Sequence, residues 1–372
     1  MTEVHSFGNL PVIAHAWNKD RTQIAVSLGK NDVRIYHKQA GKWKLMHTLT
    51  EHLSRVLAID WAPKTNRIVS ASADYNAYVW TYENDTWKPQ MVELQRTSRA
   101  VCCAKWSPQE NKFAIGSSDK NVAICYYETE QRFWAAEMIK KKPKSTVTCL
   151  AWHPNNQLLA VGSCDYRVRI YTAAIKAVGD QPQPSKWGNI ANTGELLHEF
   201  QSESGWTHDV AFSPSGENLA WVSHNSIIFA VSSKDPSRVT MEITKYLPFR
   251  CILFVSESTF IVGGHEFSPL IYNYDDRRGA IEFVEKLDQQ GASTGRQAIG
   301  EEGEFYTPYQ ASRLFDQPSM QTQSPEPVTT HQSMITQIVP YQTENTNLSK
   351  ISSADLFGQV VIWNLSGKKI KT

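Results

Sequence analysis

The chain repeats one pattern of short apolar segments seven times, and this repeat constrains the fold more than any other feature. A copy begins with an apolar segment that ends in an aromatic anchor, followed by a polar turn containing Pro or Asn. A second apolar segment, a Ser/Asp turn and a third apolar segment complete it. The first anchors lie 44, 45 and 46 residues apart, at Trp17, Trp61, Trp106 and Trp152. The later anchor positions are Phe212, Phe254 and Val339, and the third segments of the second and last copies end at Trp80 and Trp363.

A period of about 40–45 residues with four short strands per copy is typical of β-propeller blades. One small sheet cannot bury both faces alone, whereas sheets arranged in a ring cover one another. Aromatic residues, which favour strands, make up 11% of the chain. We therefore predict an all-β fold, a single seven-bladed β-propeller over residues 1–372 with two loop insertions. The repeats are expected at approximately 13–47, 52–94, 98–140, 145–200, 206–246, 249–288 and 331–365.

Aspartates recur in the turn that precedes the third segment. Asp74, Asp119 and Asp165 each lie six residues before the end of that segment. Aspartate tolerates turn conformations and accepts backbone hydrogen bonds. In the second repeat, His52 and Trp80 can join Asp74 and Ser70 or Ser72 in a buried hydrogen-bond network. His52 is therefore interpreted as structural rather than as a metal ligand or catalyst. The other repeats lack this full set and are expected to depend on apolar packing.

The segment before the first repeat contains Val4, Ser6 and Phe7. We expect it to pair as the outer strand of the last blade and so to close the ring. Closure of this kind protects the strand edges that an open sheet would expose.

Two insertions interrupt the period, at 173–194 and 289–330. The first contains Pro182, Pro184 and Gly188, which predict a loop. Its Trp187 either folds back on the propeller or anchors a partner.

The second insertion is rich in Gln, Ser, Thr, Gly and Pro, and a loop this long is functional or disordered. One part of it, YTPYQASRLFDQP, predicts a short helix, because Thr307 can be its N-cap and Pro308 its first residue. Leu314 and Phe315 fall on one stripe of this helix. A helix of about nine residues is unstable alone in water, so its apolar face must be covered. It either docks on the propeller or binds another protein, and the candidate interface residues are Tyr309, Arg313, Leu314 and Phe315.

Composition and motifs argue against an enzyme. The 38 Lys and Arg residues nearly balance the 37 Asp and Glu residues, so the net charge is only +1. This balance argues against a protein that binds nucleic acid through its overall positive charge. No phosphate-binding loop, G-x-S-x-G, H-E-x-x-H or spaced Cys/His cluster occurs, so we expect no cofactor, metal or catalytic residue. The six cysteines contain no C-x-x-C pair and are interpreted as reduced thiols of a cytoplasmic protein. Neither a secretory signal nor an apolar segment of membrane-spanning length is found, so no membrane insertion is expected.

A basic run between the third and fourth repeats consists of Lys140, Lys141, Lys142 and Lys144. It is either a solvated loop or a contact for an acidic partner, and a nuclear-import or nucleic-acid role is the third alternative.

Several stretches resemble one particular family of WD-repeat proteins, the WD-repeat subunit of the actin-related protein 2/3 complex. These include AWNKDRTQIA in the first repeat, NAYVWT in the second and WHPNNQLLA in the fourth. The resemblance extends over about residues 13–363, including both insertions.

The resemblance implies a non-catalytic scaffold in the cytoplasmic actin cytoskeleton. In that family the propeller holds small helical subunits and an actin-related subunit, and the complex answers to nucleation-promoting activators. A short helix before the last blade is directed at the mother actin filament, and Arg313, Leu314 and Phe315 match it here. Two alternatives remain: a WD-repeat adapter that reads a peptide motif in a ubiquitin-ligase or chromatin complex, and, less favoured, an enzyme.

Overall fold

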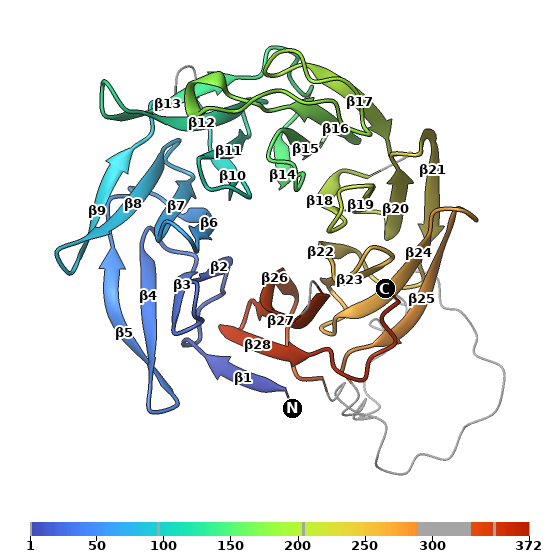
Figure 1. Ribbon diagram of the computed structural model, residues 1–372. Helices are drawn as coiled ribbons and strands as arrows, with labels where there is room; N and C mark the ends of the chain where they lie inside the picture. Colours follow the sequence, from blue (N-terminus) through green and yellow to red (C-terminus); the bar gives the residue numbers. More distant parts are fainter. Residues whose placement is uncertain (1, 95–96, 203–204, 289–328, 345–346, 372) are drawn as a thin grey trace, which may run out of the picture.

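The strands form a ring of seven four-stranded antiparallel sheets (Figure 1). The computed structural model describes residues 2–94, 97–202, 205–288, 329–344 and 347–371. This architecture confirms the seven-bladed β-propeller predicted from the repeat.

Each blade has four strands, here called a to d from the ring centre outward. Blade 1 consists of β2 (Ala14–Trp17), β3 (Gln23–Ser27), β4 (Val33–Gln39) and β5 (Lys42–Leu49). Blade 2 consists of β6 (Val56–Ala62), β7 (Arg67–Ser72), β8 (Ala77–Glu83) and β9 (Thr86–Met91). Blade 3 consists of β10 (Val101–Trp106), β11 (Lys112–Ser117), β12 (Val122–Glu128) and β13 (Phe133–Met138). Blade 4 consists of β14 (Val147–Trp152), β15 (Leu158–Ser163), β16 (Arg167–Thr172) and β17 (Leu196–Gln201).

The remaining blades follow the same order. Blade 5 consists of β18 (Thr207–Phe212), β19 (Asn218–Ser223), β20 (Ile227–Ser232) and β21 (Asp235–Ile243). Blade 6 consists of β22 (Phe249–Phe254), β23 (Thr259–Gly264), β24 (Leu270–Asp275) and β25 (Ala280–Lys286). Blade 7 consists of β26 (Ile335–Glu344), β27 (Asn347–Asp355), β28 (Gln359–Asn364) and β1 (Glu3–Ser6).

The last blade takes its outer strand from the N-terminus, as the sequence predicts. β1 pairs with β28, from Glu3 opposite Ile362 to Ser6 opposite Gln359. Phe7 follows β1 and packs in the core between blades 7 and 1. Segments from the two ends of the chain therefore complete one sheet.

The core lies between neighbouring blades rather than in one central cluster. Trp61 packs between blades 1 and 2, Trp106 between blades 2 and 3, and Trp17 between blades 7 and 1. Trp152 packs against the cluster of blades 3 and 4 but is only half-buried. The b strands are covered on both faces, and for example every residue of β15 is buried. This is why they have continuous apolar runs, while outer strands such as β5 are largely exposed.

Antiparallel pairing gives the ring two distinct faces. The a–b turns, and the c–d connections of blades 1 to 6, emerge on one face, here called the a–b face. The b–c turns and the d–a connections between blades emerge on the other, here called the b–c face. Any binding surface built from loops therefore belongs to one face or the other.

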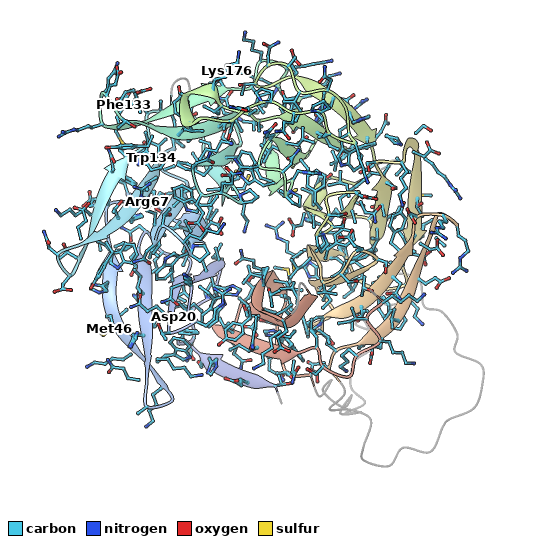
Figure 2. The ribbon with its side chains drawn as sticks, viewed as in Figure 1. Asp20, Met46, Arg67, Phe133, Trp134 and Lys176 are labelled. Carbon is cyan, nitrogen blue, oxygen red and sulfur yellow. The ribbon has the colours of Figure 1, made fainter. Side chains whose placement is uncertain are left out.

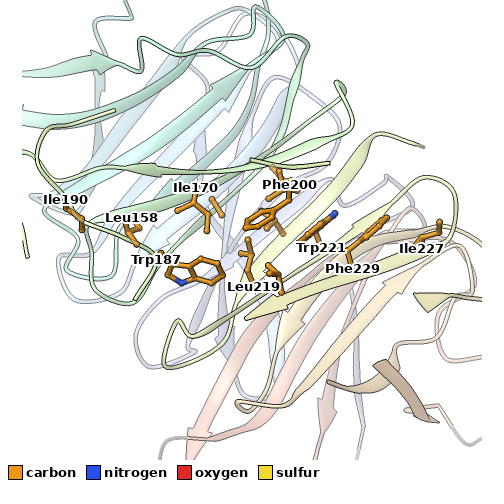
Figure 3. Packing of buried hydrophobic residues seen from close by; sticks show 14 of the residues in the cluster. Leu158, Ile170, Trp187, Ile190, Phe200, Leu219, Trp221, Ile227 and Phe229 are labelled. Carbon is orange, nitrogen blue, oxygen red and sulfur yellow. The ribbon is translucent and has the colours of Figure 1, made fainter. Parts of the chain in front are cut away.

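The first insertion folds back onto the a–b side of blades 4 and 5, which decides between the two alternatives for Trp187. Trp187 is 1% exposed and packs with Phe200 and Leu219 (Figure 3). Its indole Nε1 donates to the carbonyl oxygen of Gly216 at 2.7 Å. A short 3₁₀ helix, η1 (Lys176–Val178), is the regular element of this insertion.

Candidate interaction surfaces

A hydrogen-bond chain joins the b–c turn of blade 2 to its core. His52 Nδ1 lies 2.9 Å from Asp74 Oδ2, and His52 Nε2 lies 2.8 Å from Ser70 Oγ. Trp80 Nε1, which can only donate, reaches the same Ser70 hydroxyl at 2.8 Å. The Asp74 carboxylate can only accept, so His52 donates to it from Nδ1, and a neutral His52 then accepts from the Ser70 hydroxyl at Nε2. Burial lowers the pKa of His52, which agrees with this neutral form.

A second complete network occurs in blade 7, contrary to the expectation that the other repeats lack one. His331 Nδ1 lies 2.8 Å from Asp355 Oδ2, and His331 Nε2 lies 2.6 Å from Ser353 Oγ. Trp363 Nε1 donates to Ser353 Oγ at 2.7 Å. The side chains of His331 and Asp355 are both 0% exposed, so the network is as buried as that of blade 2.

Blades 3 and 4 hold their b–c turns with other groups. The Ser98 backbone N–H and hydroxyl both donate to Asp119 Oδ2 at 2.9 Å. Asp165 accepts from the Lys144 backbone N–H at 2.7 Å, and Arg169 Nη2 lies 2.8 Å from it. Burial acts to raise the pKa of Asp165, but the hydrogen bonds and the Arg169 charge outweigh it and lower that pKa. These aspartates thus fix the turns of the b–c face in place.

The basic loop is exposed at all four lysines, Lys140, Lys141, Lys142 and Lys144. Its backbone is nevertheless fixed, because the Tyr171 hydroxyl donates to the Lys141 carbonyl at 2.7 Å. Lys142 Nζ donates to Asn121 Oδ1 at 2.6 Å. The loop therefore presents positive charge from a rigid base.

A groove of about 990 Å³ lies beside this loop and the first insertion. Lys140, Lys141 and Lys176 line it together with Glu137 and Glu195. Figure 2 shows Lys176 at the outer rim of the ring. The groove combines three ammonium groups with two carboxylates and is mainly polar, unlike an enzyme pocket with a few converging groups.

The central channel contains charged side chains but no metal centre among the described residues. Lys105 Nζ lies 3.8 Å from Asp60 Oδ1, and Asp60 accepts from the Trp106 backbone N–H at 2.7 Å. Asp209 similarly accepts from the Ile252 backbone N–H at 3.0 Å, and burial raises its pKa to about 6. Both carboxylates thus join the inner strands of neighbouring blades.

All six cysteines are free, four of them buried and Cys102 and Cys164 half-buried. In the described part of the chain, no helix is both long enough and apolar enough to cross a bilayer. The predicted interface helix with Tyr309, Arg313, Leu314 and Phe315 lies outside the described residues, so it stays a prediction.

The ring of blades and the His–Ser–Trp–Asp networks define the class: this is a WD-repeat β-propeller. The model of the WD domain, G-beta repeat, matches residues 43–81. The model of the anaphase-promoting complex subunit 4 WD40 domain matches residues 104–183.

Three relatives give the family. The chain is 40% identical over 363 residues to actin-related protein 2/3 complex subunit 1A-B of Xenopus laevis, covering 97% of this chain and 96% of that protein. It is 35% identical to subunit 1B of Arabidopsis thaliana, covering 98% and 97%. It is 34% identical to subunit 1 of Schizosaccharomyces pombe, covering 95% and 97%. The chain belongs to the family of actin-related protein 2/3 complex subunit 1.

Proposed function

We propose that this chain is a non-catalytic scaffold of an actin-related protein 2/3 complex and supports nucleation and branching of actin filaments. The observation that carries the proposal is similarity to subunit 1 proteins over nearly the whole of both chains. The closed ring adds physical support, since rigid platforms suit the assembly of several partners.

The proposed partners are the small helical subunits, an actin-related subunit, activators and the mother filament. Nucleation, with any ATP binding, belongs to the actin-related subunits in this scheme. The helix around Tyr309, Arg313, Leu314 and Phe315 is the proposed filament contact. The loop of Lys140, Lys141, Lys142 and Lys144 is the proposed contact for an acidic partner. The chain would act in the cytoplasmic actin cytoskeleton, without binding nucleic acid or entering a membrane.

Affinity purification of the tagged chain from its source cells tests the proposal. Co-purification of a seven-subunit assembly with two actin-like proteins is the expected result. A WD-repeat adapter would instead bring down ubiquitin-ligase or chromatin proteins. A complex that assembled and branched filaments at normal rates without this chain would also contradict the proposal.

Replacement of Leu314 and Phe315 by Ser tests the filament contact separately. It should weaken binding of the assembled complex to filaments and leave the Tm of the chain nearly unchanged. A large fall in Tm would instead mean that the helix docks on its own propeller.

A further inference from the structure

Exposed large apolar side chains are unevenly divided between the two faces of the ring. Among the described residues, seven exposed large apolar side chains lie on the b–c face, and they include Leu53, Tyr75, Tyr166 and Trp206. The others lie on strands such as β5, β21 and β25, and none lies in a described turn of the a–b face. A surface with several exposed aromatic residues is typical of an interaction site.

Two of these aromatic residues adopt a backbone conformation that the fold would build more easily with glycine. Tyr75 has φ of 75° and Tyr166 has φ of 63°. Bulky residues are unfavourable in this left-handed region, and the b–c turn of blade 7 uses Gly358, with φ of 84°. The tyrosines are 50% and 44% exposed, so burial in the propeller does not offset the strain. Lys120, Ser226 and Phe267 adopt the same conformation in the equivalent turns, so it belongs to the turn itself. Tyr75 and Tyr166 differ in placing an exposed aromatic ring at this position.

The turns that carry these tyrosines are held rigidly by the aspartates of the networks described above. Asp74 Oδ1 accepts from the Asn76 backbone N–H at 2.9 Å, and Asp74 Oδ2 from the Leu53 backbone N–H at 2.8 Å. Asp165 holds the turn of Tyr166 through Lys144 and Arg169. A turn whose backbone is already held loses little backbone entropy when a partner binds to the side chain it carries.

Trp206 is held on the same face by a second cluster. Its indole stacks on His224 with ring centroids 4.2 Å apart, and it remains 38% exposed. Arg250 Nη1, which can only donate, lies 2.9 Å from His208 Nδ1, so His208 Nε2 carries the proton and donates to His224 Nδ1 at 3.0 Å. Burial and the Arg250 charge lower the pKa of His208 to about 3, in agreement with a neutral ring.

The b–c face is also basic. Exposed cations in its described turns, connections and adjoining strand ends outnumber the exposed carboxylates, Glu51 and Glu93. The cations are Lys30, Arg55, Arg99, Lys120, Lys245 and Arg250, together with the basic loop. A complementary partner would carry carboxylates around an apolar centre.

We propose that the b–c face of blades 2 to 5 is the docking surface for another subunit of the complex, one that presents an apolar surface bordered by carboxylates. Tyr75, Tyr166 and Trp206 are its main apolar contacts, and Arg250 and the basic loop supply the charge. This proposal rests on the proposed scaffold function and adds the face and residues through which the scaffold works.

The double variant Tyr75→Gly/Tyr166→Gly tests the proposal, because folding and docking should change in opposite senses. Relief of the left-handed strain should leave the Tm of the chain unchanged or raise it. Loss of two interface aromatics should reduce the other subunits that co-purify with the tagged chain by about tenfold or more. Trp206→Ala should weaken co-purification in the same way. Arg250→Glu should weaken it most at low salt and make it less dependent on salt, because salt screens the new repulsion.

The matched control is Ser226→Gly, in the b–c turn of blade 5. Ser226 has φ of 61°, so this substitution relieves similar strain without removing an aromatic ring. It should leave co-purification unchanged.

The outcomes separate failure of this proposal from failure of the scaffold function. If the wild-type chain brings down the complex and the double variant does so equally well, the docking surface is wrong and the scaffold function stands. If the wild-type chain brings down no such complex, the scaffold function itself fails. If the variants assemble normally but no longer bind an activator segment, the face binds the activator and not a subunit. If they lose only self-association, measured by sedimentation, the face binds a second copy of this chain, which would also overturn the proposal.

Discussion

A buried ion pair fastens the first insertion to the propeller, and its removal should have a large and pH-dependent effect. Lys112, from β11, contacts Asp180 of the insertion, and their side chains are 0% and 5% exposed. Asp180 also accepts from the Ile175 backbone N–H at 2.9 Å and from the side-chain amides of Asn111 and Asn156, each at 3.3 Å. Asp180→Ala would leave the Lys112 ammonium group buried without its carboxylate.

Breaking a buried pair in this way costs about 3–5 kcal/mol, a large part of a typical total of about 5–15 kcal/mol. Urea denaturation followed by tryptophan fluorescence would measure the loss. Lys112→Met should cost less, because an apolar chain suits the buried site and Asp180 keeps three N–H donors. The exposed pair of Lys88 and Glu83 is the control, and Glu83→Ala should cost less than about 1 kcal/mol.

The pH dependence tests the cause. Burial lowers the pKa of Lys112, and Asp180 opposes that effect, so Asp180→Ala should lower the pKa further. At a pH between the two lysine pKa values, Lys112 of the variant is then protonated in the unfolded chain but not in the folded chain. Because the unfolded state binds the extra proton, the unfolding free energy of the variant rises with pH up to the ordinary lysine pKa. The destabilisation should therefore shrink between pH 7 and pH 10. A loss below about 1 kcal/mol at pH 7, or one that did not change with pH, would refute the argument.

Three further changes test the ring and its networks. Burial lowers the pKa of His15 to about 3, so the unfolded chain alone binds this proton below pH 6.5. His15 alone should lower the unfolding free energy by about 2 kcal/mol at pH 5 relative to neutral pH. His15→Gln should therefore reduce the pH dependence measured by urea titration by this amount, and an unchanged dependence would contradict the argument. His331→Ala should destabilise the chain by about 2–4 kcal/mol, similar to His52→Ala, because each leaves buried hydrogen-bonding groups without a partner. If His331→Ala melted like the wild type, the two networks would not be equivalent. Phe7→Ala should cost about 3–5 kcal/mol through the core between blades 7 and 1, and deletion of residues 1–8 should lower the Tm further. A truncated chain with an unchanged Tm would show that β1 does not close the ring.

The blade 7 network shows why sequence spacing found one network and missed the other. Asp355 lies two residues after Ser353, whereas Asp74 lies four residues after Ser70. A search for aspartate six residues before the end of the third strand therefore passes over Asp355. The signal that both blades share is a Ser and a Trp ten residues apart, joined by the indole N–H.

The periodicity of the chain by itself determined the seven blades and the core tryptophans, whereas the closing N-terminal strand was predicted from the segment before the first repeat and the need to close the ring. It could do so because a strand's neighbours within a blade are its neighbours in sequence, and each blade repeats the same packing. Contacts between distant segments carry no such period. The pair of Lys112 with Asp180 and the hydrogen bond from Arg250 to His208 depend on how neighbouring blades meet. Only the tertiary structure decided that exposed aromatic residues gather on one face, because the direction of each turn relative to the ring is set by strand pairing and closure.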